Sequence, residues 1–481
     1  MTSHWGGRLA RALALLFLGW GIASCGTKEP GPKQEVLPRL DVLHKGAWLL
    51  GVDARQRFLL FRPQTGAGTY AKVLPEGGDV RICDPADTSI LAEDGGSVLL
   101  WSAPSEERTR TAWLWRPGPF ACIPFTTSSQ GDIVHDRALS YVAFTESDAS
   151  AGTTSLRVMD AAACTAKDCP SRTLLQVPGS TLLLQAGGTT VLATDATQAW
   201  LIDVPSGAVV PLGTVAGPCT LSSDGTRYSL FSAAGHLQVF DTATRSLQWE
   251  RSWAEDVSRE GWEVESALMT DAKVLVLNVY EPPPPDRIPL VHATLACDAT
   301  SCQVLAGGQG GCWWGLGRTD LVSCSHLLRC GPYGCEYQFT YFDASMRLLS
   351  NTTTTDVRRP QPAFSEDLAH RVSLYQDDSA DTLTWVGPAG VHTLKATGAV
   401  DMRFITFLPG AERLVFAQTL TRSDGVRETR LAAWDGVSLT DLLPLPGAPV
   451  QGAHPRAAPT ALYSTIESAD PSSLDIIRIQ L

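Results

Sequence analysis

Residues Leu221–Trp249 read LSSDGTRYSLFSAAGHLQVFDTATRSLQW, and this stretch decides the fold of the chain. It holds two short apolar runs on either side of a small-residue loop, so the pattern predicts paired strands. The pair Asp224-Gly225 favours a tight turn, because glycine accepts a positive φ and aspartate bonds its own backbone. The stretch therefore predicts short strands joined by tight turns.

Strand-like runs of this kind recur along the chain from about residue 40 onward. They end in Asp or another polar residue followed by a turn, near residues 62, 116, 160, 203, 241, 293, 343, 387, 435 and 478. The spacing averages about 46 residues, which is close to the length of one propeller blade of four short strands. We count nine or ten such units.

These units resemble the WD40-like and TolB-like β-propeller repeats, which begin with a phrase like Ser-x-Asp-Gly. Residues 221–249 are the clearest copy, and Trp434-Asp435 is the only Trp-Asp dipeptide. The resemblance implies an all-β fold for residues 41–481, a β-propeller of about 7–10 four-stranded blades. Residues 36–43 and the C-terminal Leu474–Leu481 are both strand-like, which predicts that pairing of the N- and C-terminal strands closes the ring.

The first 25 residues carry an export pattern. Arg8 and Arg11 precede an apolar run, Ala12–Ile22, that is too short to span a bilayer, and Ile22-Ala23-Ser24-Cys25 closes the pattern. This order resembles the lipobox of bacterial lipoproteins, in which the cysteine is acylated and becomes the mature N-terminus. An ordinary signal peptide with an incidental cysteine and a buried apolar helix are the alternatives.

The lipobox implies a lipoprotein signal peptide at 1–24, acyl chains such as palmitate on Cys25, and a flexible Pro/Gly-rich tether over 25–40. No later run of 18 consecutive apolar residues occurs, so the N-terminal lipid would be the only membrane attachment. Gly26 stands where Asp would favour the inner membrane in the best-known families. The predicted location is therefore the cell envelope, at the periplasmic side of the outer membrane of a Gram-negative bacterium.

Eleven cysteines follow Cys25, as expected in an oxidising compartment. Three pairs have four residues between them, a spacing that a local disulfide can bridge in a tight turn. Of two wider pairs, one flanks a hairpin-like segment and the other would join two strands of one unit. Metal binding by the cysteines is the alternative to disulfides. The predicted disulfides are Cys164–Cys169, Cys297–Cys302, Cys330–Cys335, Cys312–Cys324 in the hairpin and Cys83–Cys122 within one unit, which leaves Cys219 single.

The charge balance argues against nucleic acid as a partner. The chain has 38 Lys+Arg against 50 Asp+Glu, a net charge of −12. An acidic surface repels phosphate backbones, and no basic run offsets this repulsion.

Two histidine–aspartate pairs raise the question of catalysis, His135 with Asp136 and His370 with Asp367. A Ser/His/Asp site needs its nucleophile on a sharp elbow, and neither G-x-S-x-G nor HExxH occurs in the sequence. The histidines are therefore interpreted as turn or surface residues, and no catalytic residue is predicted.

Two acidic clusters are candidates for calcium binding, Asp377, Asp378 and Asp381 in one and Glu146 with Asp148 in the other. Neither fits the regular oxygen-ligand loop with its closing Glu. Solvated hairpin tips, and no metal site, are predicted.

Residues Asp241–Trp249 resemble the tryptophan-docking repeat of quinoprotein propellers, which would imply a quinone-dependent dehydrogenase. The chain has Arg245 where that pattern has Gly, and it holds one good copy only. Trp249 is therefore interpreted as a packing residue, and no cofactor is predicted.

Two further segments each allow two interpretations. Residues 281–286 (EPPPPD) form either a rigid loop between strands or a projecting polyproline arm that binds a partner. Cys312-Trp313-Trp314 provides either core packing beside a disulfide or an exposed aromatic hot spot.

The sequence thus predicts a lipid-anchored, non-enzymatic propeller that binds or scaffolds a protein or glycan in the envelope. The alternative is an envelope hydrolase or lyase whose active site lies in the central channel. Three or more ionisable side chains converging in a channel pocket would favour the enzyme, and a flat apolar patch would favour the scaffold.

Overall fold

The computed structural model describes residues 38–480, apart from 54, 67, 76, 84–87, 93–95, 103–108, 117–121, 129–132, 149, 166–168, 180–181, 233–235, 259, 283–291, 308, 315–317, 332–333, 355–361, 377–379, 398–399, 409–412, 451–455, 459 and 469–472. The predicted signal peptide (1–24), Cys25 and the predicted tether up to residue 37 lie outside the described residues. No helix in the described part is long and apolar enough to cross a membrane.

The described strands form ten antiparallel sheets of four strands, and each sheet is one blade. Blades 1 to 5 consist of β2 (Ala47–Val52), β3 (Phe58–Pro63), β4 (Thr69–Val73) and β5 (Asp79–Cys83); β6 (Thr88–Leu91), β7 (Val98–Trp101), β8 (Thr109–Trp115) and β9 (Cys122–Ser128); β10 (Ile133–His135), β11 (Tyr141–Asp148), β12 (Thr153–Asp160) and β13 (Ser171–Pro178); β14 (Leu183–Gly187), β15 (Thr190–Thr194), β16 (Gln198–Asp203) and β17 (Ala208–Thr214); β18 (Thr220–Leu221), β19 (Arg227–Phe231), β20 (Leu237–Asp241) and β21 (Leu247–Arg251).

Blades 6 to 10 follow the same order, except that the last blade takes its fourth strand from the N-terminus. They consist of β22 (Glu263–Met269), β23 (Leu275–Tyr280), β24 (His292–Cys297) and β25 (Cys302–Gly307); β26 (Gln309–Trp314), β27 (Leu321–Gly331), β28 (Gly334–Asp343) and β29 (Leu348–Thr354); β30 (Ala363–Phe364), β31 (Arg371–Gln376), β32 (Ala380–Gly387) and β33 (Gly390–Thr397); β34 (Val400–Phe407), β35 (Leu414–Thr421), β36 (Arg427–Trp434) and β37 (Leu439–Leu445); β38 (Arg456–Ala458), β39 (Ala461–Glu467), β40 (Leu474–Gln480) and β1 (Arg39–Lys45). The described helices are a short 3-10 turn, Ala161–Ala163, and α1, Trp253–Asp256.

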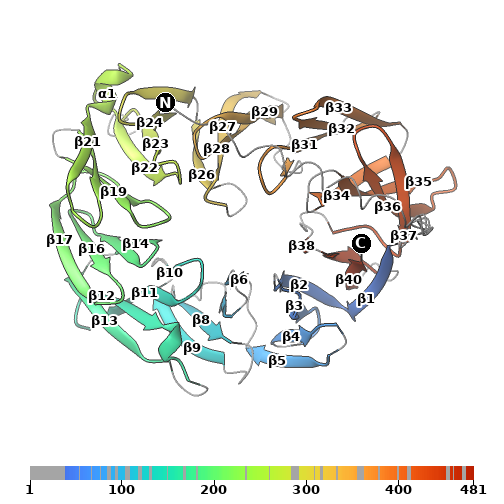
Figure 1. Ribbon diagram of the computed structural model, residues 1–481, viewed down its shortest axis with the longest axis horizontal. Coiled ribbons are helices and arrows are strands. Elements are labelled where there is room, and N and C mark those ends of the chain that lie inside the picture. The colour runs from blue at the N-terminus through green and yellow to red at the C-terminus, as the bar shows by residue number, and fades with distance from the viewer. Residues whose placement is uncertain are drawn as a thin grey trace, which may run out of the picture. The chain divides into compact units, whose positions relative to one another are not determined.

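The blades form a ring around a central channel, with the first strand of each blade innermost and the fourth outermost (Figure 1). Because consecutive strands are antiparallel, the turns after the first and third strands lie on one face of the ring. The hairpins after the second strands lie on the opposite face. We call these the turn face and the hairpin face. The prediction of an all-β propeller is confirmed, and the described residues form ten blades.

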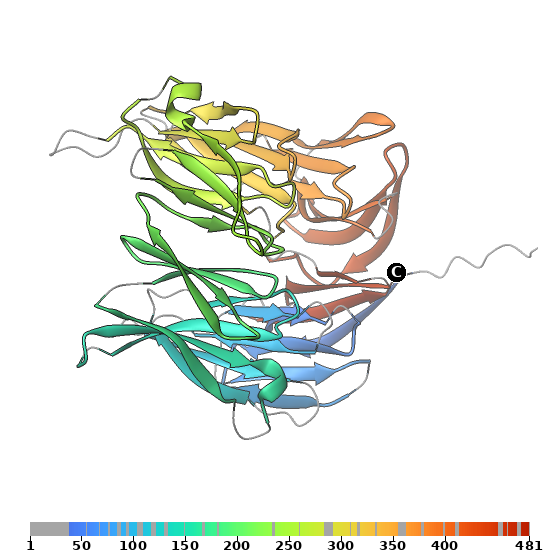
Figure 2. The same ribbon diagram turned by 60° about the vertical axis from the view of Figure 1, so that its left-hand side comes forward.

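The ring is closed by strands from both ends of the chain, as predicted. β1 pairs with β40 from Arg39 opposite Gln480 to Lys45 opposite Asp475, and Figure 2 shows the blue N-terminal strand beside the marked C-terminus. Arg478 donates to Asp41 across this pair at 2.7 Å. The strand begins two residues before residue 41, where the propeller was expected to start.

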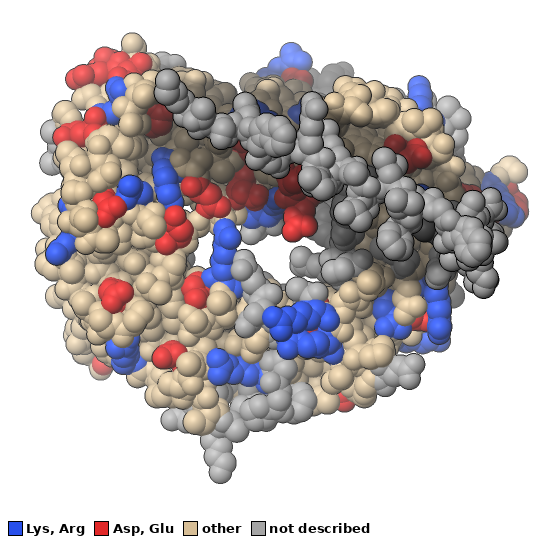
Figure 3. Space-filling view, in the orientation of Figure 1, with Lys and Arg blue, Asp and Glu red and all other residues tan. Residues whose placement is uncertain are grey.

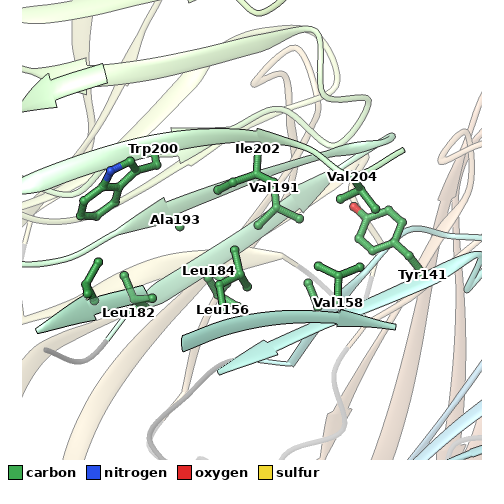
Figure 4. Packing of buried hydrophobic residues seen from close by; sticks show 12 residues of the cluster. Tyr141, Leu156, Val158, Leu182, Leu184, Val191, Ala193, Trp200, Ile202 and Val204 are labelled. Carbon is green, nitrogen blue, oxygen red and sulfur yellow. The ribbon is translucent and has the colours of Figure 1, made fainter. Parts of the chain in front are cut away.

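The core consists of apolar layers between neighbouring blades. Both faces of a blade are covered by its neighbours, so strands such as β3 and β19 have nearly continuous runs of buried residues. Each buried Leu or Val contributes roughly 1.5–3 kcal/mol. Figure 4 shows the layer between blades 3 and 4, which consists of Tyr141, Ala143, Leu156, Val158, Val177, Leu182, Leu184, Val191, Ala193, Trp200, Ile202 and Val204.

The described residues contain five disulfides, and they are the five predicted pairs. Four of them join cysteines 5 or 12 residues apart in the sequence. Among these, Cys312–Cys324 joins directly opposed residues of β26 and β27, as the hairpin-like sequence predicted. The prediction was wrong about the fifth, Cys83–Cys122, because it does not lie within one unit. It joins β5 to β9, the outermost strands of blades 1 and 2. Cys219 is free and buried.

Candidate functional site

The turn after the first strand follows one backbone pattern in five blades. In blade 5 the N–H of Gly225 donates to the carbonyl of Ser222 at 2.8 Å, and the φ of Gly225 is +72°. The equivalent residues of four other blades make the same bond at positive φ although they are not glycine. They are Gln56, Leu139, Lys273 and Leu368. This backbone conformation costs a non-glycine residue about 1 kcal/mol, which contacts made by the turns must offset.

Hydrogen bonds join the turns of neighbouring blades at the turn-face end of the channel. Lys273 of blade 6 donates from Nζ to Asp224 Oδ2 of blade 5 at 2.5 Å. Thr319 of blade 7 donates from Oγ1 to Asp271 Oδ2 of blade 6 at 3.0 Å, and Ser223 of blade 5 donates its hydroxyl to the other oxygen of Asp271. Turn residues of three blades are therefore linked around the channel.

Arg137 reaches these residues from across the channel. It lies in the turn between β10 and β11, its Nη2 is 3.6 Å from Asp271 Oδ2, and it donates to Thr319 Oγ1. Blade 3 is adjacent to neither blade 6 nor blade 7, so this contact crosses the mouth of the channel. Figure 3 shows acidic and basic side chains around the central opening. We call Arg137, Ser223, Asp224, Asp271, Lys273 and Thr319 the mouth network.

Two carboxylates at this end of the channel, those of Asp224 and Asp320, have lowered pKa values. Burial alone would raise the pKa of Asp224, but the bond from Lys273 and those from the backbone and hydroxyl of Thr226 outweigh it and lower the pKa. Two hydrogen bonds from Arg318, at 2.9 and 2.7 Å, lower the pKa of Asp320 in blade 7. The same pairing raises the pKa of Arg318.

We expect these carboxylates to make the propeller sensitive to acid. Because the pKa of Asp224 is lower in the folded state than in the unfolded chain, its contribution to stability is complete above pH about 5 and is lost as the pH falls through about 4 and below. Urea unfolding between pH 7 and pH 3 should therefore show a falling free energy of unfolding. Asp224→Asn should be less stable than the wild type at pH 7 and should show a shallower decline; an equal slope would contradict the assignment.

The Ser, Asp and His residues of blade 8 lie together but do not form a catalytic triad. Ser365 donates its hydroxyl to Asp367 at 2.6 Å and accepts the backbone N–H of His370 at 2.9 Å. The imidazole accepts from Trp385 Nε1 at 3.2 Å instead of contacting the hydroxyl. The bond from Ser365 lowers the pKa of Asp367, so this group stabilises the turn before β31.

The other predicted turn residues are engaged locally. His135 Nδ1 lies 2.8 Å from the carbonyl oxygen of Asp136, and Arg157 donates to Glu146 at 2.6 Å. Asp148 accepts the backbone N–H two residues later at 2.9 Å, which closes the hairpin tip. Asp148 lies at the hairpin tip as predicted, whereas His135 is the last residue of β10 and Glu146 pairs with Ser155 within the β11–β12 ladder.

Asp381 corrects one prediction. It was expected at a solvated hairpin tip, but it is 5 % exposed and accepts the backbone N–H of Met402 at 2.8 Å. The reason is that β32 already begins at Ala380, which places Asp381 against blade 9. Asp377 and Asp378 lie outside the described residues. Within the described part of the chain, no group of three His, Cys, Asp or Glu is placed to hold a metal ion.

The aromatic candidates divide between packing and exposure. Trp314 packs in the apolar layer of blades 6 and 7 beside the Cys312–Cys324 disulfide, whereas Trp313 is 48 % exposed. Trp249 is partly buried against the layer between blades 5 and 6, which agrees with its interpretation as a packing residue. Residues 283–286, most of the proline-rich segment 281–286, lie outside the described residues.

Comparison with known proteins found similar solved structures only. No family model matches the chain, and no curated protein matches it. Among solved structures, it is similar to a eukaryotic initiation factor (9 % identity, 83 % of this chain and 89 % of that chain, TM-score 0.43), to TolB from Acinetobacter baumannii (14 %, 63 % and 81 %, 0.28) and to the WD40 repeats of RRP9 (9 %, 60 % and 90 %, 0.31). At these identities and TM-scores the similarities carry no argument about activity.

Proposed function

We propose that this protein is a lipid-anchored propeller of the cell envelope that binds or scaffolds a protein or glycan partner without catalysing a reaction. The mouth network is the observation that carries the binding role. Turns of blades 3, 5, 6 and 7 place charged and hydroxyl groups there around one end of the channel. A rigid ring holds such turn residues at fixed positions, which suits recognition of a partner.

An envelope hydrolase or lyase is the second candidate, because ionisable side chains of several blades converge at the channel. Binding is favoured over catalysis because the carboxylates are paired. A general acid or base needs a pKa shifted toward the working pH. The pKa values of Asp224 and Asp320 are instead lowered, away from neutrality. Turnover of envelope peptides or glycans that is lost in Asp271→Asn would favour the enzyme.

The point where the chain enters the ring supports a role close to a membrane. Arg39 lies opposite Gln480, at the turn-face end of the outermost strand of blade 10. A lipid on Cys25 would attach the chain 14 residues before this point. The five disulfides are compatible with an extracytoplasmic location.

We expect Cys25→Ser to release the protein from membranes, since the lipid is the only attachment proposed. The measurement is fractionation of cells that produce the wild type or the variant, with detection in the soluble and membrane fractions. The wild type should require detergent for extraction. A variant that stays in the membrane fraction without detergent would contradict lipid anchoring.

We expect a partner to be captured from the mouth of the channel. A photo-crosslinking residue in place of Arg137, which is 58 % exposed, should link the partner in intact cells. The matched control replaces Val426, which is 52 % exposed in the hairpin between β35 and β36 on the opposite face. One product seen from position 137 and absent from position 426 supports the proposal. Equal labelling from both positions, or none from either, contradicts a binding role for the mouth network.

A further inference from the structure

A groove with a volume of about 470 Å³ lies between blades 4 and 5 on the turn face. Blade 4 contributes its second, third and fourth strands, and blade 5 contributes the turns that follow β18 and β20. The lining residues are Thr190, Leu201, Asp203, Ala208, Val210, Gly225, Thr226, Asp241, Thr242, Ala243 and Arg245. The volume lies within the range of pockets that take small ligands or short peptide segments.

Arg245 occupies a backbone position that favours glycine. Its φ is +58°, and its N–H donates to the carbonyl of Asp241 at 2.8 Å. The equivalent turn of blade 4 has Gly207 at this place, with a φ of +72° and the same bond to Asp203 at 2.8 Å. An arginine at this φ lowers the free energy of unfolding by about 1 kcal/mol relative to glycine. The backbone conformation of the turn therefore does not explain why an arginine is found at position 245.

The Arg245 side chain makes no hydrogen bond with the described residues, although its charge acts on Tyr228: burial raises the pKa of Tyr228, and the charge of Arg245 partly opposes that rise. No ion pair there includes Arg245. Asp241 accepts from Arg227 and from the backbone N–H of Thr244, the latter at 2.9 Å. Asp203 Oδ2 accepts from the backbone N–H and the hydroxyl of Ser206 in its own turn. Asp203 Oδ1 is bonded to none of the described residues. The groove thus combines a free cation with one free carboxylate oxygen.

The remainder of the lining is largely apolar. Leu201, Ala208, Val210 and Ala243 contribute hydrocarbon, and Thr190 adds a methyl and a hydroxyl group. None of the lining residues is aromatic, so the groove lacks a flat ring on which a sugar would stack. A ligand that fits needs an anionic end for Arg245, an N–H donor for Asp203 Oδ1 and an apolar side chain for the hydrocarbon.

We propose that this groove binds the carboxyl terminus of a polypeptide that ends in an apolar residue. The terminal carboxylate pairs with the Arg245 guanidinium, the last side chain contacts Leu201 and Val210, and a peptide N–H donates to Asp203 Oδ1. Capture of a terminal carboxylate by fixed donors is a known mode of peptide recognition. This inference rests on the proposed binding function and assigns it one class of protein partner.

The test uses two fluorescein-labelled hexapeptides, Gly-Ser-Gly-Ser-Val-Leu with a free carboxyl terminus and the same peptide amidated, with binding followed by fluorescence anisotropy. We expect the free acid to bind the purified protein at least about 10-fold more tightly than the amide, as for loss of one charge-assisted bond. Equal affinity of acid and amide would overturn the proposal. Displacement of the peptide by glucuronic acid at equal concentration would also overturn it, in favour of an acidic sugar.

Arg245→Gly separates recognition from folding. Glycine suits the positive φ, so the variant should unfold at the same or a slightly higher urea concentration while it loses at least about 10-fold in affinity for the free-acid peptide. Arg245→Lys should keep part of the affinity, and Arg427→Ala on the hairpin face should keep all of it. Unchanged affinity in Arg245→Gly would overturn the assignment. Failure of peptide binding together with crosslinking from position 137 would leave the proposed function standing.

Discussion

A chain that begins at Ala47, and therefore lacks β1, is expected to be less stable by on the order of 5 kcal/mol than the full propeller. Six residue pairs between β1 and β40 are lost, and the edge of β40 becomes open. Leu40 and Leu43 no longer pack against the layers on either side of blade 10. Arg478 loses its 2.7 Å bond to the carboxylate of Asp41.

The measurement is urea unfolding of both chains under oxidising conditions. A synthetic peptide of residues 38–46 added in trans should restore most of the lost stability, because it can replace β1 beside β40. The same peptide with Asp41→Ala should restore less, since it lacks the carboxylate that accepts from Arg478. If the shortened chain unfolds at the same urea concentration as the full chain, β1 does not contribute to the stability of the closed ring.

Gly187→Ala is expected to destabilise the propeller by about 4 kcal/mol or more, an effect at the upper end for a single substitution. The added Cβ would lie 2.1 Å from the carbonyl oxygen of Ser222 and 2.7 Å from the backbone nitrogen of Gly225. Both neighbours are backbone atoms of the adjacent blade, so no side chain can rotate away. The turns of blades 4 and 5 would have to separate, and the bond from Gly188 N–H to the Ser223 carbonyl, 3.1 Å long, would be lost.

Gly78→Ala is the matched control, because nothing lies within 4 Å of its Cβ position. Its free energy of unfolding should stay within about 0.5 kcal/mol of the wild type. Urea unfolding of the three proteins, followed by near-UV circular dichroism, measures the difference. Similar stability of Gly187→Ala and Gly78→Ala would show that the two turns are not in close contact.

The repeat was visible in the sequence because the bonds that create it are local. The aspartate at the end of a third strand accepts backbone N–H groups two to four residues later, as in Asp203, Asp241, Asp298, Asp343 and Asp435. Such a turn depends on a few consecutive residues, so it leaves a readable pattern. The position near residue 62 is an exception, since it marks the second strand of blade 1. The third strand there, β4, ends at Val73 without an aspartate.

The mouth network left no such pattern. Arg137 and Thr319 are 182 residues apart and meet only because the ring brings blade 3 opposite blade 7. Arg137, Asp271 and Thr319 do share one place in their units, the turn after the first strand. An alignment of the units would have indicated that place, but not which side chains touch.

The sequence by itself determined the strands, the tight turns, the period and the four disulfides that close short loops, because each of these depends on neighbours along the chain. The tertiary structure alone decided that the predicted bridge from Cys83 to Cys122 joins two blades, that Asp381 is buried against blade 9 and that Arg245 lies beside the groove. These features depend on how closely whole blades pack and in what order they surround the channel. That packing arises from apolar layers spread over the entire chain, and no local run of residues encodes it.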